Sequence, residues 1–223
     1  VSGTTGESPT LTDEEKVRLF RFAVEHAAGR CKIIAGTGSN ETAHSVHLTR
    51  KAQEAGVDGA LLVTPYYNKP SQEGVYQHFK TIAEAAPSLP IMLYNVPSRT
   101  VTSISAETTL RLAQIPNIVA TKECVLEQMT EIVAQAPEGF RLYSGDDGIT
   151  LPTLSVGGYG IVSVASHIVG PRMKDLISAF KAGRVDEAIR INQELFPVFK
   201  GLFNCPHPVP NPVPVKYALT HRG

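Results

Sequence analysis

The stretch Ile118-Val119-Ala120-Thr121-Lys122 is a short apolar run that ends in a lysine. Its length and composition indicate a strand of a parallel sheet that is buried on both faces. A similar run, Ile91-Met92-Leu93, is followed at once by Tyr94 and, a few residues later, by Arg99. The carboxyl ends of parallel strands lie at the same edge of a sheet, where ligands bind. The two strand ends are therefore expected to bring an amine, a phenol and a guanidinium together.

These three groups are suited to making and breaking an imine with a small keto acid. A desolvated lysine loses its proton more readily and can attack a carbonyl carbon. The sequence therefore predicts covalent amine catalysis with Lys122 as the nucleophile. The alternative is a lysine that reaches out of the strand end to pair with Glu123.

The composition indicates a soluble globular protein that acts on small molecules. The 223 residues are 42% hydrophobic, and 21 basic side chains balance 21 acidic ones, so no overall field would attract nucleic acid or an anionic membrane. Three cysteines, Cys31, Cys124 and Cys205, lack metal-type spacing and fit free thiols in a reducing compartment. Since neither a spanning segment nor a signal peptide is recognisable, the expected location is cytoplasmic.

Apolar runs of strand length alternate with segments of helical period, which is the pattern of βα units. The expected strands cover residues 31–35, 59–63, 91–93, 118–121, 141–143 and 161–164, after a strand end at residues 1–3. The expected helices cover residues 13–28, 41–55, 72–85, 105–113, 126–136, a segment ending near 156, 171–182 and a segment from 183 to about 199.

Polar residues after most strands favour a (β/α)₈ TIM barrel, whose active site lies at the carboxyl ends of its strands. A doubly wound open sheet is the competing architecture, but it usually offers a single crevice. The predicted organisation is a barrel without strand 1 over residues 1–182, holding strands 2–8, and the start of a C-terminal helical region over residues 183–223. The chain is thus expected to be truncated at both ends.

Seven motifs in order resemble the dihydrodipicolinate synthase and N-acetylneuraminate lyase family of pyruvate-dependent class I aldolases. They are Gly3-Thr4-Thr5-Gly6-Glu7, Gly36-Thr37-Gly38, Thr64-Pro65-Tyr66-Tyr67-Asn68, Tyr94-Asn95-Val96-Pro97-Ser98-Arg99-Thr100, Lys122-Glu123, Ser144-Gly145-Asp146-Asp147 and Asn211-Pro212-Val213-Pro214-Val215-Lys216. The resemblance implies the condensation of pyruvate with aspartate 4-semialdehyde to 4-hydroxy-tetrahydrodipicolinate, in lysine and diaminopimelate biosynthesis. It requires no cofactor, because the electron sink is an imine between Lys122 and pyruvate.

The resemblance also implies roles for single residues. Tyr94 is the expected proton donor and acceptor, because a phenol close to an iminium can have its pKa lowered. Thr4 and Tyr67 resemble the rest of the family's proton relay, and Tyr67 implies a homo-oligomer, a dimer of dimers, because it reaches a neighbouring subunit's site. The structural alternatives are a half-buried aromatic at 94 and a surface tyrosine at 67.

The remaining implied residues bind substrates. Thr5 would hold the pyruvate carboxylate from a tight turn, and Arg99 would grip the carboxylate of the second substrate through two parallel hydrogen bonds. Gly145 and Val162 would line the pyruvate pocket. The alternatives are a turn before a helix at Thr5, a surface salt bridge at Arg99, and simple turn or strand structure at Gly145 and Val162.

Members of this family often carry an inhibitory lysine site at a subunit interface, near the residues here numbered Ser8, Pro9, Asn40, His44 and Tyr66. An acidic residue is common where His44 stands in lysine-sensitive members. A histidine cannot offer a full negative charge to the effector's ammonium group. The sequence therefore predicts weak or absent control by lysine.

Two departures from the family pattern leave other functions open. The family usually continues Lys-Glu-Ala with serine or threonine and glycine, whereas here Cys124, Val125 and Leu126 follow Lys122-Glu123. The loop after the catalytic strand is therefore expected to be altered and shorter. Cys124 itself fits a packed thiol. The chain stops soon after Tyr217, so the family's last helices are expected to be missing. The alternatives are another pyruvate aldolase, such as an N-acetylneuraminate or 2-keto-3-deoxy sugar acid lyase, and a non-catalytic fragment or scaffold. A phosphate site at Gly36-Thr37-Gly38-Ser39 lacks the P-loop lysine and is disfavoured.

Overall fold

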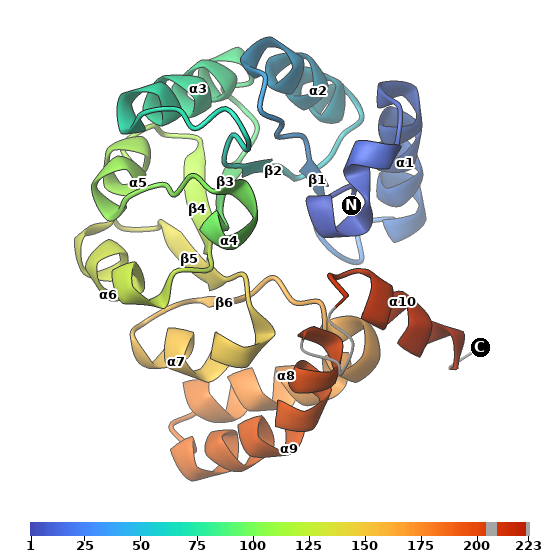
Figure 1. The fold of residues 1–223 in the computed structure, drawn as a ribbon, viewed down its shortest axis with the longest axis vertical. Coiled ribbons are helices and arrows are strands. Elements are labelled where there is room, and N and C mark those ends of the chain that lie inside the picture. The colour runs from blue at the N-terminus through green and yellow to red at the C-terminus, as the bar shows by residue number, and fades with distance from the viewer. Residues whose placement is uncertain (204–208, 222–223) are drawn as a thin grey trace. The chain divides into compact units, whose positions relative to one another are not determined.

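The computed structural model describes residues 1–203 and 209–221 (Figure 1). The chain divides into two compact units, Val1–Leu142 and Tyr143–Gly223. The first unit is an α/β assembly and the second is mainly helical. Each has its own apolar core. None of the helices in the described ranges combines the length and the apolar composition needed to cross a membrane.

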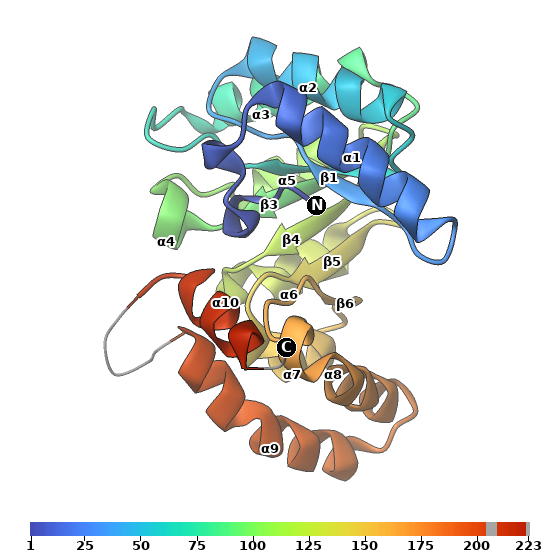
Figure 2. The same ribbon diagram turned by 90° about the vertical axis from the view of Figure 1, so that its right-hand side faces the viewer.

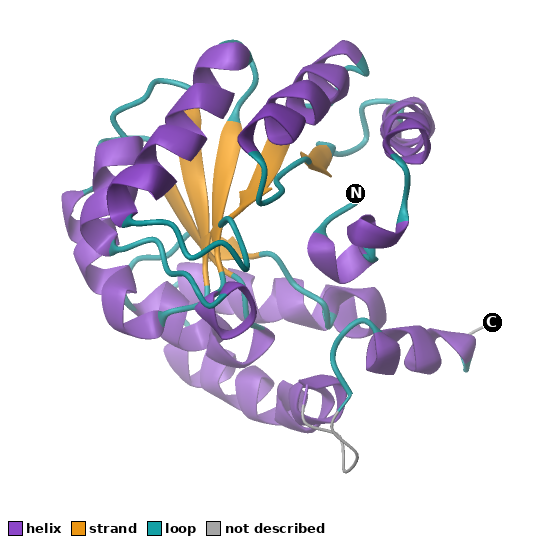
Figure 3. Ribbon diagram, turned by 45° about the horizontal axis from the view of Figure 1, so that its top comes forward, coloured by secondary structure: helices purple, strands orange, loops and turns teal. Residues whose placement is uncertain are grey.

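The first unit is built on four parallel strands that pair in chain order. They are β1 (Ile34–Gly36), β2 (Gly59–Val63), β3 (Ile91–Asn95) and β4 (Ile118–Glu123). Figure 3 shows these strands side by side, with the helices on their outer face. The expected parallel α/β architecture is therefore confirmed for this unit, while closure into eight strands stays a prediction.

Helices follow the strands of the first unit as the periodicity predicts. They are α1 (Asp13–Ala27), α2 (Thr42–Glu54), α3 (Gln72–Ala85), α4 (Pro97–Thr100), α5 (Ala106–Leu112) and α6 (Leu126–Gln135), with short 3₁₀ turns at Thr4–Gly6 and Ser8–Thr10. The expected start of α1 is confirmed by a capping box, in which Thr12 Oγ1 accepts from Glu15 N and Glu15 Oε2 accepts from Thr12 N at 2.8 Å. The single turn α4 was not predicted, because four residues show no helical period.

The core of the first unit lies between the strands and the surrounding helices. Phe20 from α1, Leu48 from α2 and Phe79 from α3 are buried against strand residues such as Leu62 and Leu93. Near-continuous apolar strands of this kind are buried on both faces, as expected for a parallel sheet covered by helices. The strands β3 and β4 are apolar over most of their length and carry their polar groups at their C-terminal tips.

The first strand differs from its expected range and begins at Ile34 rather than at residue 31. The side chain of Asp58 accounts for the difference, since it accepts hydrogen bonds from Ile33 N and Lys32 Nζ, both at 2.8 Å. Cys31 and Lys32 are exposed. These residues are therefore held by a loop carboxylate and not by a strand ladder.

The opening residues pair with β1, in line with the strand end expected there. The amino group of Val1 donates to the carbonyl oxygen of Ile34 at 2.7 Å, and Gly36 N donates to the carbonyl oxygen of Val1 at 2.8 Å. No regular strand is formed over residues 1–3. Two backbone bonds nevertheless place the following turn, Thr4–Gly6, beside the tip of β1.

Two glycines allow close backbone approaches at the tip of β1. A Cβ atom on Gly36 would lie 2.2 Å from the carbonyl oxygen of Ser2, and one on Gly38 would lie 2.5 Å from Val63 N. Neither backbone neighbour can move aside without shifting its strand. The glycines of the Gly36-Thr37-Gly38 motif therefore have a packing role, which needs no bound phosphate.

The second unit contains two short parallel strands and a helical core. Strand β5 (Arg141–Ser144), which contains the boundary between the units, pairs with β6 (Gly160–Ile161), and a 3₁₀ turn spans Asp147–Ile149. The helices are α7 (Thr150–Ser155), α8 (Ser166–Lys181), α9 (Val185–Phe203) and α10 (Val213–Thr220). The expected strand at 161–164 is thus only two residues long, and α10 lies in a proline-rich stretch that predicted no helix.

Helices α8 and α9 lie side by side and supply most of this core (Figure 2). Along α9, Ala188, Ile191, Leu195, Phe199 and Leu202 are buried, at the spacing of one helical face. Helix α8 begins five residues before its expected start at Pro171, because a first turn precedes a kink at Val169, where φ is −125°. The proline thus marks the second part of a bent helix.

The buried imidazole of His78 predicts that the stability of the first unit depends on pH. His78 is 6% exposed; its Nδ1 lies 2.9 Å from Thr42 Oγ1, and its Nε2 has no partner among the described residues. Burial lowers the pKa of His78 to about 4, although Glu41 acts in the opposite direction. The unfolded chain, with an ordinary histidine pKa near 6.5, therefore binds more protons as the pH falls below that value.

The free energy of unfolding is expected to be independent of His78 above about pH 7 and to fall by about 2 kcal/mol by pH 5. Urea titrations at both pH values will measure this difference. In His78→Asn, which keeps a polar atom near Thr42, the difference shrinks by that amount. The matched control His47→Asn, at an exposed position of α2, keeps the wild-type difference. Equal pH dependence in all three proteins would contradict the assignment.

Candidate active site

Lys122 and Tyr94 form the centre of the candidate site at the tips of β4 and β3. The two residues are direct partners in the parallel register, so their side chains leave the same face of the sheet. Lys122 Nζ lies 3.7 Å from the centroid of the Tyr94 ring. Both residues are buried, with 7% and 5% of their surface exposed. The structure thus brings together the amine and the phenol that the sequence predicts as partners.

The environment of Tyr94 keeps its phenol protonated in the free protein. Burial raises the pKa of Tyr94 above its ordinary value, the nearby thiol of Cys124 acts in the same direction, and the guanidinium of Arg99 lowers it. The lowered pKa that is expected for a phenol beside an iminium is therefore not found in the free protein, where burial has the largest effect. The ring face also provides a favourable position for the Lys122 ammonium.

A small cleft connects Tyr94 with the N-terminal turn that carries Thr4. Its lining residues are Ser2, Gly3, Thr4, Ser8, Gly36, Gly38, Leu61, Val63 and Tyr94. Thr4 is exposed and Thr5 half-buried in the same 3₁₀ turn. The strand tip of β1, with the close approach at Gly36, holds this turn beside Tyr94. Thr4 and Tyr94 therefore share one cleft, as the family resemblance implies.

Tyr67 projects away from the described surroundings of the site. It is 87% exposed, and its φ of 72° is in the left-handed region, which is costly for a tyrosine. The neighbouring Asn68 anchors the turn through hydrogen bonds to Asn40, from Nδ2 to the carbonyl oxygen at 2.9 Å and from the Asn40 amide at 3.3 Å. The structure does not bring Tyr67 to the cleft within a single chain.

Arg99 is positioned by the short helix α4, which begins two residues after β3 ends. Its guanidinium is exposed, and its charge acts on the Tyr94 phenol. A positive group at the open side of the site can meet an anionic substrate without a desolvation cost to the free protein. The alternative prediction for Arg99 was a surface salt bridge. No such ion pair to Arg99 is present in the described parts of the chain.

Gly145 and Val162 belong to the second unit and are described within it. Val162 N donates to the carbonyl oxygen of Ser144 at 2.9 Å, so both residues lie at the paired ends of β5 and β6. Asp147 fixes the loop beyond them by accepting from Val164 N at 3.0 Å and Ala165 N at 2.9 Å. Their predicted part in a pyruvate pocket stays a prediction.

The residues of the predicted lysine site have partners of their own in the free chain. His44 Nε2 lies 2.8 Å from Asp13 Oδ2, and Lys16 Nζ lies 3.3 Å from Asp13 Oδ1. Burial opposes ionisation of Asp13, but hydrogen bonds from His44 and Lys16 lower its pKa below the ordinary value.

The other members of that predicted site lie nearby in the first unit. Ser2 Oγ donates to Ser8 Oγ at 3.2 Å, Pro9 lies in the turn Ser8–Thr10, Asn40 is bound to Asn68, and Tyr66 packs against the cluster of Val63, Tyr94 and Val96.

Cys124 packs against the same cluster of Val63, Tyr94 and Val96, as expected for a packed thiol. Cys31 is exposed, and neither cysteine forms a disulfide within the described ranges. Cys205 lies outside the described residues, as do its neighbours up to Pro208. Among the side chains that the structure describes, no group of three or more His, Cys, Asp or Glu is arranged to hold a metal ion.

Two polar residues of the site were not assigned a role from the sequence. Asn95 and Glu123 follow the central pair directly, are also partners in the register, and are both fully buried. Glu123 is bound to Asn95, to Gln128 and to two backbone amides. The signal that could have found them is the pair of polar dipeptides, Tyr-Asn and Lys-Glu, at two strand ends. Glu123 faces away from the Lys122 side of the sheet, because neighbours in a strand point to opposite faces.

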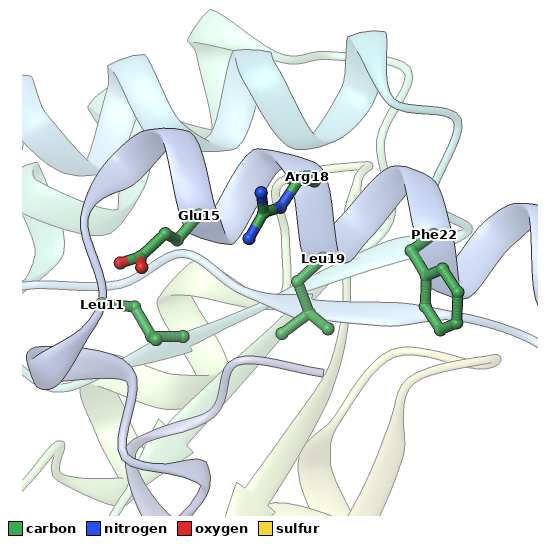
Figure 4. A pocket seen from close by; sticks show the side chains of 5 residues that line it. All are labelled: Leu11, Glu15, Arg18, Leu19 and Phe22. Atoms are coloured by element: carbon green, nitrogen blue, oxygen red, sulfur yellow. The ribbon is translucent and has the colours of Figure 1, made fainter.

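A separate groove on the surface of α1 carries no such chemistry. It is lined by Leu11, Glu15, Arg18, Leu19 and Phe22 (Figure 4). The carboxylate of Glu15 already takes part in the helix cap, and the other side chains are apolar or cationic. This groove lacks a nucleophile and is not the candidate active site.

Comparisons with known proteins identify the family of this chain. A family model described as the dihydrodipicolinate synthetase family matches residues 1–223. A 4-hydroxy-tetrahydrodipicolinate synthase from Bacillus velezensis is 59% identical over 225 residues, which span all of this chain and 76% of the relative.

Two solved structures are similar at the level of the fold. A dihydrodipicolinate synthase from Bacillus anthracis has a TM-score of 0.95 and 54% identity, covering 100% of this chain and 75% of that chain. A relative from Cyanidioschyzon merolae, solved with lysine bound, has a TM-score of 0.95 and 49% identity, covering 99% and 74%. The resemblance predicted from the seven motifs is confirmed, and the chain belongs to the dihydrodipicolinate synthetase family.

Proposed function

We propose that this chain condenses pyruvate with L-aspartate 4-semialdehyde to give 4-hydroxy-tetrahydrodipicolinate, as the relatives named for this activity do. The observation that carries the proposal is the position of Lys122 Nζ, 3.7 Å from the Tyr94 ring centroid at the buried tips of two parallel strands. A nucleophilic amine with a proton-carrying phenol beside it is the minimal equipment for an imine mechanism.

The first half of the reaction activates pyruvate. The unprotonated amine of Lys122 attacks the keto carbon, and the resulting carbinolamine loses water to form an iminium. The iminium withdraws electrons, so a base can remove a methyl proton and leave an enamine. Tyr94 is placed to give a proton to the departing hydroxyl and to take one back, with Thr4 in the same cleft as the next hydroxyl of a relay.

The second half joins the two substrates. The enamine carbon attacks the aldehyde carbon, the new alkoxide takes a proton, and the amino group of the second substrate displaces Lys122 as the ring closes. One water is lost overall. Arg99 binds the carboxylate of the semialdehyde and Thr5 that of pyruvate. No metal or organic cofactor takes part in these steps.

The exposed Tyr67 supports an oligomeric enzyme. Tyr67 is 87% exposed on a turn whose positive φ is costly for a tyrosine, and strained backbone positions of this kind cluster at functional sites. In the assembly we propose, Tyr67 of one subunit completes the proton relay of the next. Cross-linking and sedimentation of wild type and Tyr67→Ser, followed by turnover assays, test this role.

The chemical test of the function is reductive trapping. Purified chain is mixed with pyruvate and borohydride, and its intact mass and peptide map are measured. A pyruvate-derived mass increase on Lys122 is expected. An aldehyde panel then identifies the second substrate, with aspartate semialdehyde preferred over sugar aldehydes because Arg99 matches a carboxylate. A folded chain that gives no adduct would contradict the proposal and favour a scaffold.

Free lysine is expected to bind weakly or not at all. The site that the family uses for this effector contains His44 bound to Asp13, and Asp13 already holds the ammonium of the buried Lys16. A free lysine would have to compete with a cation that is part of the chain. Isothermal titration should show no saturable heat at millimolar lysine, with the Cyanidioschyzon merolae relative as the positive control. Micromolar binding coupled to inhibition would show that the prediction is wrong.

A further inference from the structure

A buried polar pair lies directly behind the catalytic pair. In the register of β3 and β4, Tyr94 is opposite Lys122, and Asn95 is opposite Glu123. Side chains alternate between the two faces of a strand, so the second pair lies on the face away from the cleft. Asn95 and Glu123 are both 0% exposed. The two strand tips are therefore tied together on one face by a polar pair while they present the reacting groups on the other.

The carboxylate of Glu123 is surrounded by donors. Its Oε1 accepts from Cys124 N at 2.8 Å, from Val125 N at 2.7 Å and from Asn95 Nδ2 at 2.9 Å. Its Oε2 accepts from Gln128 Nε2 at 2.7 Å and from Asn95 Nδ2 at 3.1 Å. Burial raises the pKa of Glu123 to about 7, while these hydrogen bonds lower it. Because every one of these partners is a donor, the arrangement is fully satisfied only by the ionised form.

The same network reaches the segment after α4, the helix that carries Arg99. Asn95 Oδ1 accepts from Ile104 N at 2.9 Å, and its Nδ2 donates to the carbonyl oxygen of Ile104 at 3.2 Å. Gln128 Nε2 donates to that same carbonyl at 3.0 Å. One buried carboxylate therefore joins the tips of β3 and β4, the loop after Lys122 and the start of α6.

The register that this pair holds is not continuous along the strands. Ile91 is opposite Ile118, but Met92 is opposite Ala120, so Val119 is an extra residue in β4. A shift of one residue would turn Lys122 to the other face of the sheet. Contacts at the strand tips are therefore needed to hold the register beyond this bulge.

We propose that Glu123, as a carboxylate held by Asn95, is a positioning residue that places the Lys122 amine against Tyr94. The inference rests on the proposed imine chemistry and adds a residue that acts through another. A reacting group displaced by about 1 Å can lose roughly 100-fold in rate. Glu123 itself touches no substrate, since it lies on the opposite face from the cleft.

The amide Glu123→Gln separates this role from simple packing. It keeps the shape, and its Oε1 can still accept from the two backbone amides. Its NH₂ group, however, would face the NH₂ groups of Asn95 and Gln128, so donor meets donor. Adding Asn95→Asp in the same chain restores an acceptor opposite that NH₂ group, but it also removes the donor to the Ile104 carbonyl oxygen, so the expected recovery is partial. The double variant thus keeps one carboxylate and one amide at the two positions, with the groups exchanged between the strands.

The test measures the rate of imine trapping by pyruvate and borohydride, together with kcat and the KM for pyruvate. E123Q is expected to lower the trapping rate and kcat roughly 10- to 100-fold with little change in KM. The double variant N95D/E123Q should recover at least about fivefold over E123Q. The matched control Thr121→Val lies on the same face of β4, two residues earlier, at a buried hydroxyl without a partner in the described structure, and should keep the wild-type rate.

The outcomes distinguish this inference from the proposed function. No adduct in folded wild type defeats the imine proposal itself. An adduct in wild type with an unchanged trapping rate in E123Q overturns the positioning role alone, as does loss of activity that the double variant fails to recover. Should E123Q not fold, Gln128→Met decides, since it removes one donor from an outer helix. A decrease of about threefold or more in the trapping rate supports the role, and an unchanged rate overturns it.

Discussion

Replacement of Lys122 by arginine is expected to abolish both imine formation and turnover. The guanidinium keeps the positive charge and the stacking on Tyr94, but it stays protonated and cannot act as a nucleophile. We expect kcat/KM to fall at least about 10³-fold, because the covalent route is lost and not merely slowed. The pyruvate-derived mass increase after borohydride reduction should disappear in the same variant.

The matched control for this result is Lys32→Arg. Lys32 is exposed and paired with Asp58 at 2.8 Å, away from the strand tips that form the cleft. The Lys32→Arg variant should trap pyruvate and catalyse the reaction at the wild-type rate. Circular dichroism should show the same fold for Lys32→Arg and Lys122→Arg. A reducible adduct that persists in Lys122→Arg would place the nucleophile elsewhere and remove the basis of the mechanism.

Tyr94→Phe is expected to retain the imine and to lose proton transfer. The ring that lies 3.7 Å from Lys122 Nζ is kept, so the amine keeps its place, while the hydroxyl that moves protons is removed. Loss of one general acid and base typically costs 10²- to 10⁴-fold, and we expect kcat to fall by about that factor. Slow trapping should still yield an adduct on Lys122 after long incubation.

The step affected by this change can be measured separately. Wild type in heavy water should exchange the methyl protons of pyruvate for deuterium, since the enamine forms reversibly, and NMR will follow the signal. In Tyr94→Phe this exchange should slow in proportion to kcat. Tyr76→Phe is the control, because Tyr76 also has a cation over its ring, with Arg111 Cζ at 4.2 Å, but lies on α3. Normal exchange in Tyr94→Phe would exclude the phenol from proton transfer.

Much of the architecture follows from local sequence patterns. Strands β2 to β5 and helices α1, α2, α3, α5 and α6 lie where alternating apolar runs and helical periods place them, within a few residues. These patterns are local, because a buried strand and an amphipathic helix repeat over only a few residues. The helix α4 was missed because a single turn shows no helical period, and α10 was missed because it lies in a proline-rich stretch. The family assignment came from motifs at the strand ends.

A mechanism could also be proposed from single residues, whereas the contacts between these residues could not be predicted. Lysine, tyrosine and arginine at two neighbouring strand ends suffice to predict an imine mechanism, since parallel strands bring these ends together. The sequence alone gives no distance between Lys122 Nζ and the Tyr94 ring. That distance depends on a register that includes a bulge at Val119, which has no local sequence signature.

Local patterns and motifs therefore specified the class of fold, the family and the candidate reactive residues. Which of these residues meet was set by tertiary packing. It placed Tyr94 under Lys122, put Asn95 and Glu123 together in a buried donor and acceptor network, and gave His44 an internal partner in Asp13. The division arises because burial, pKa and hydrogen bonding depend on groups far apart in the chain, whereas secondary structure depends chiefly on near neighbours.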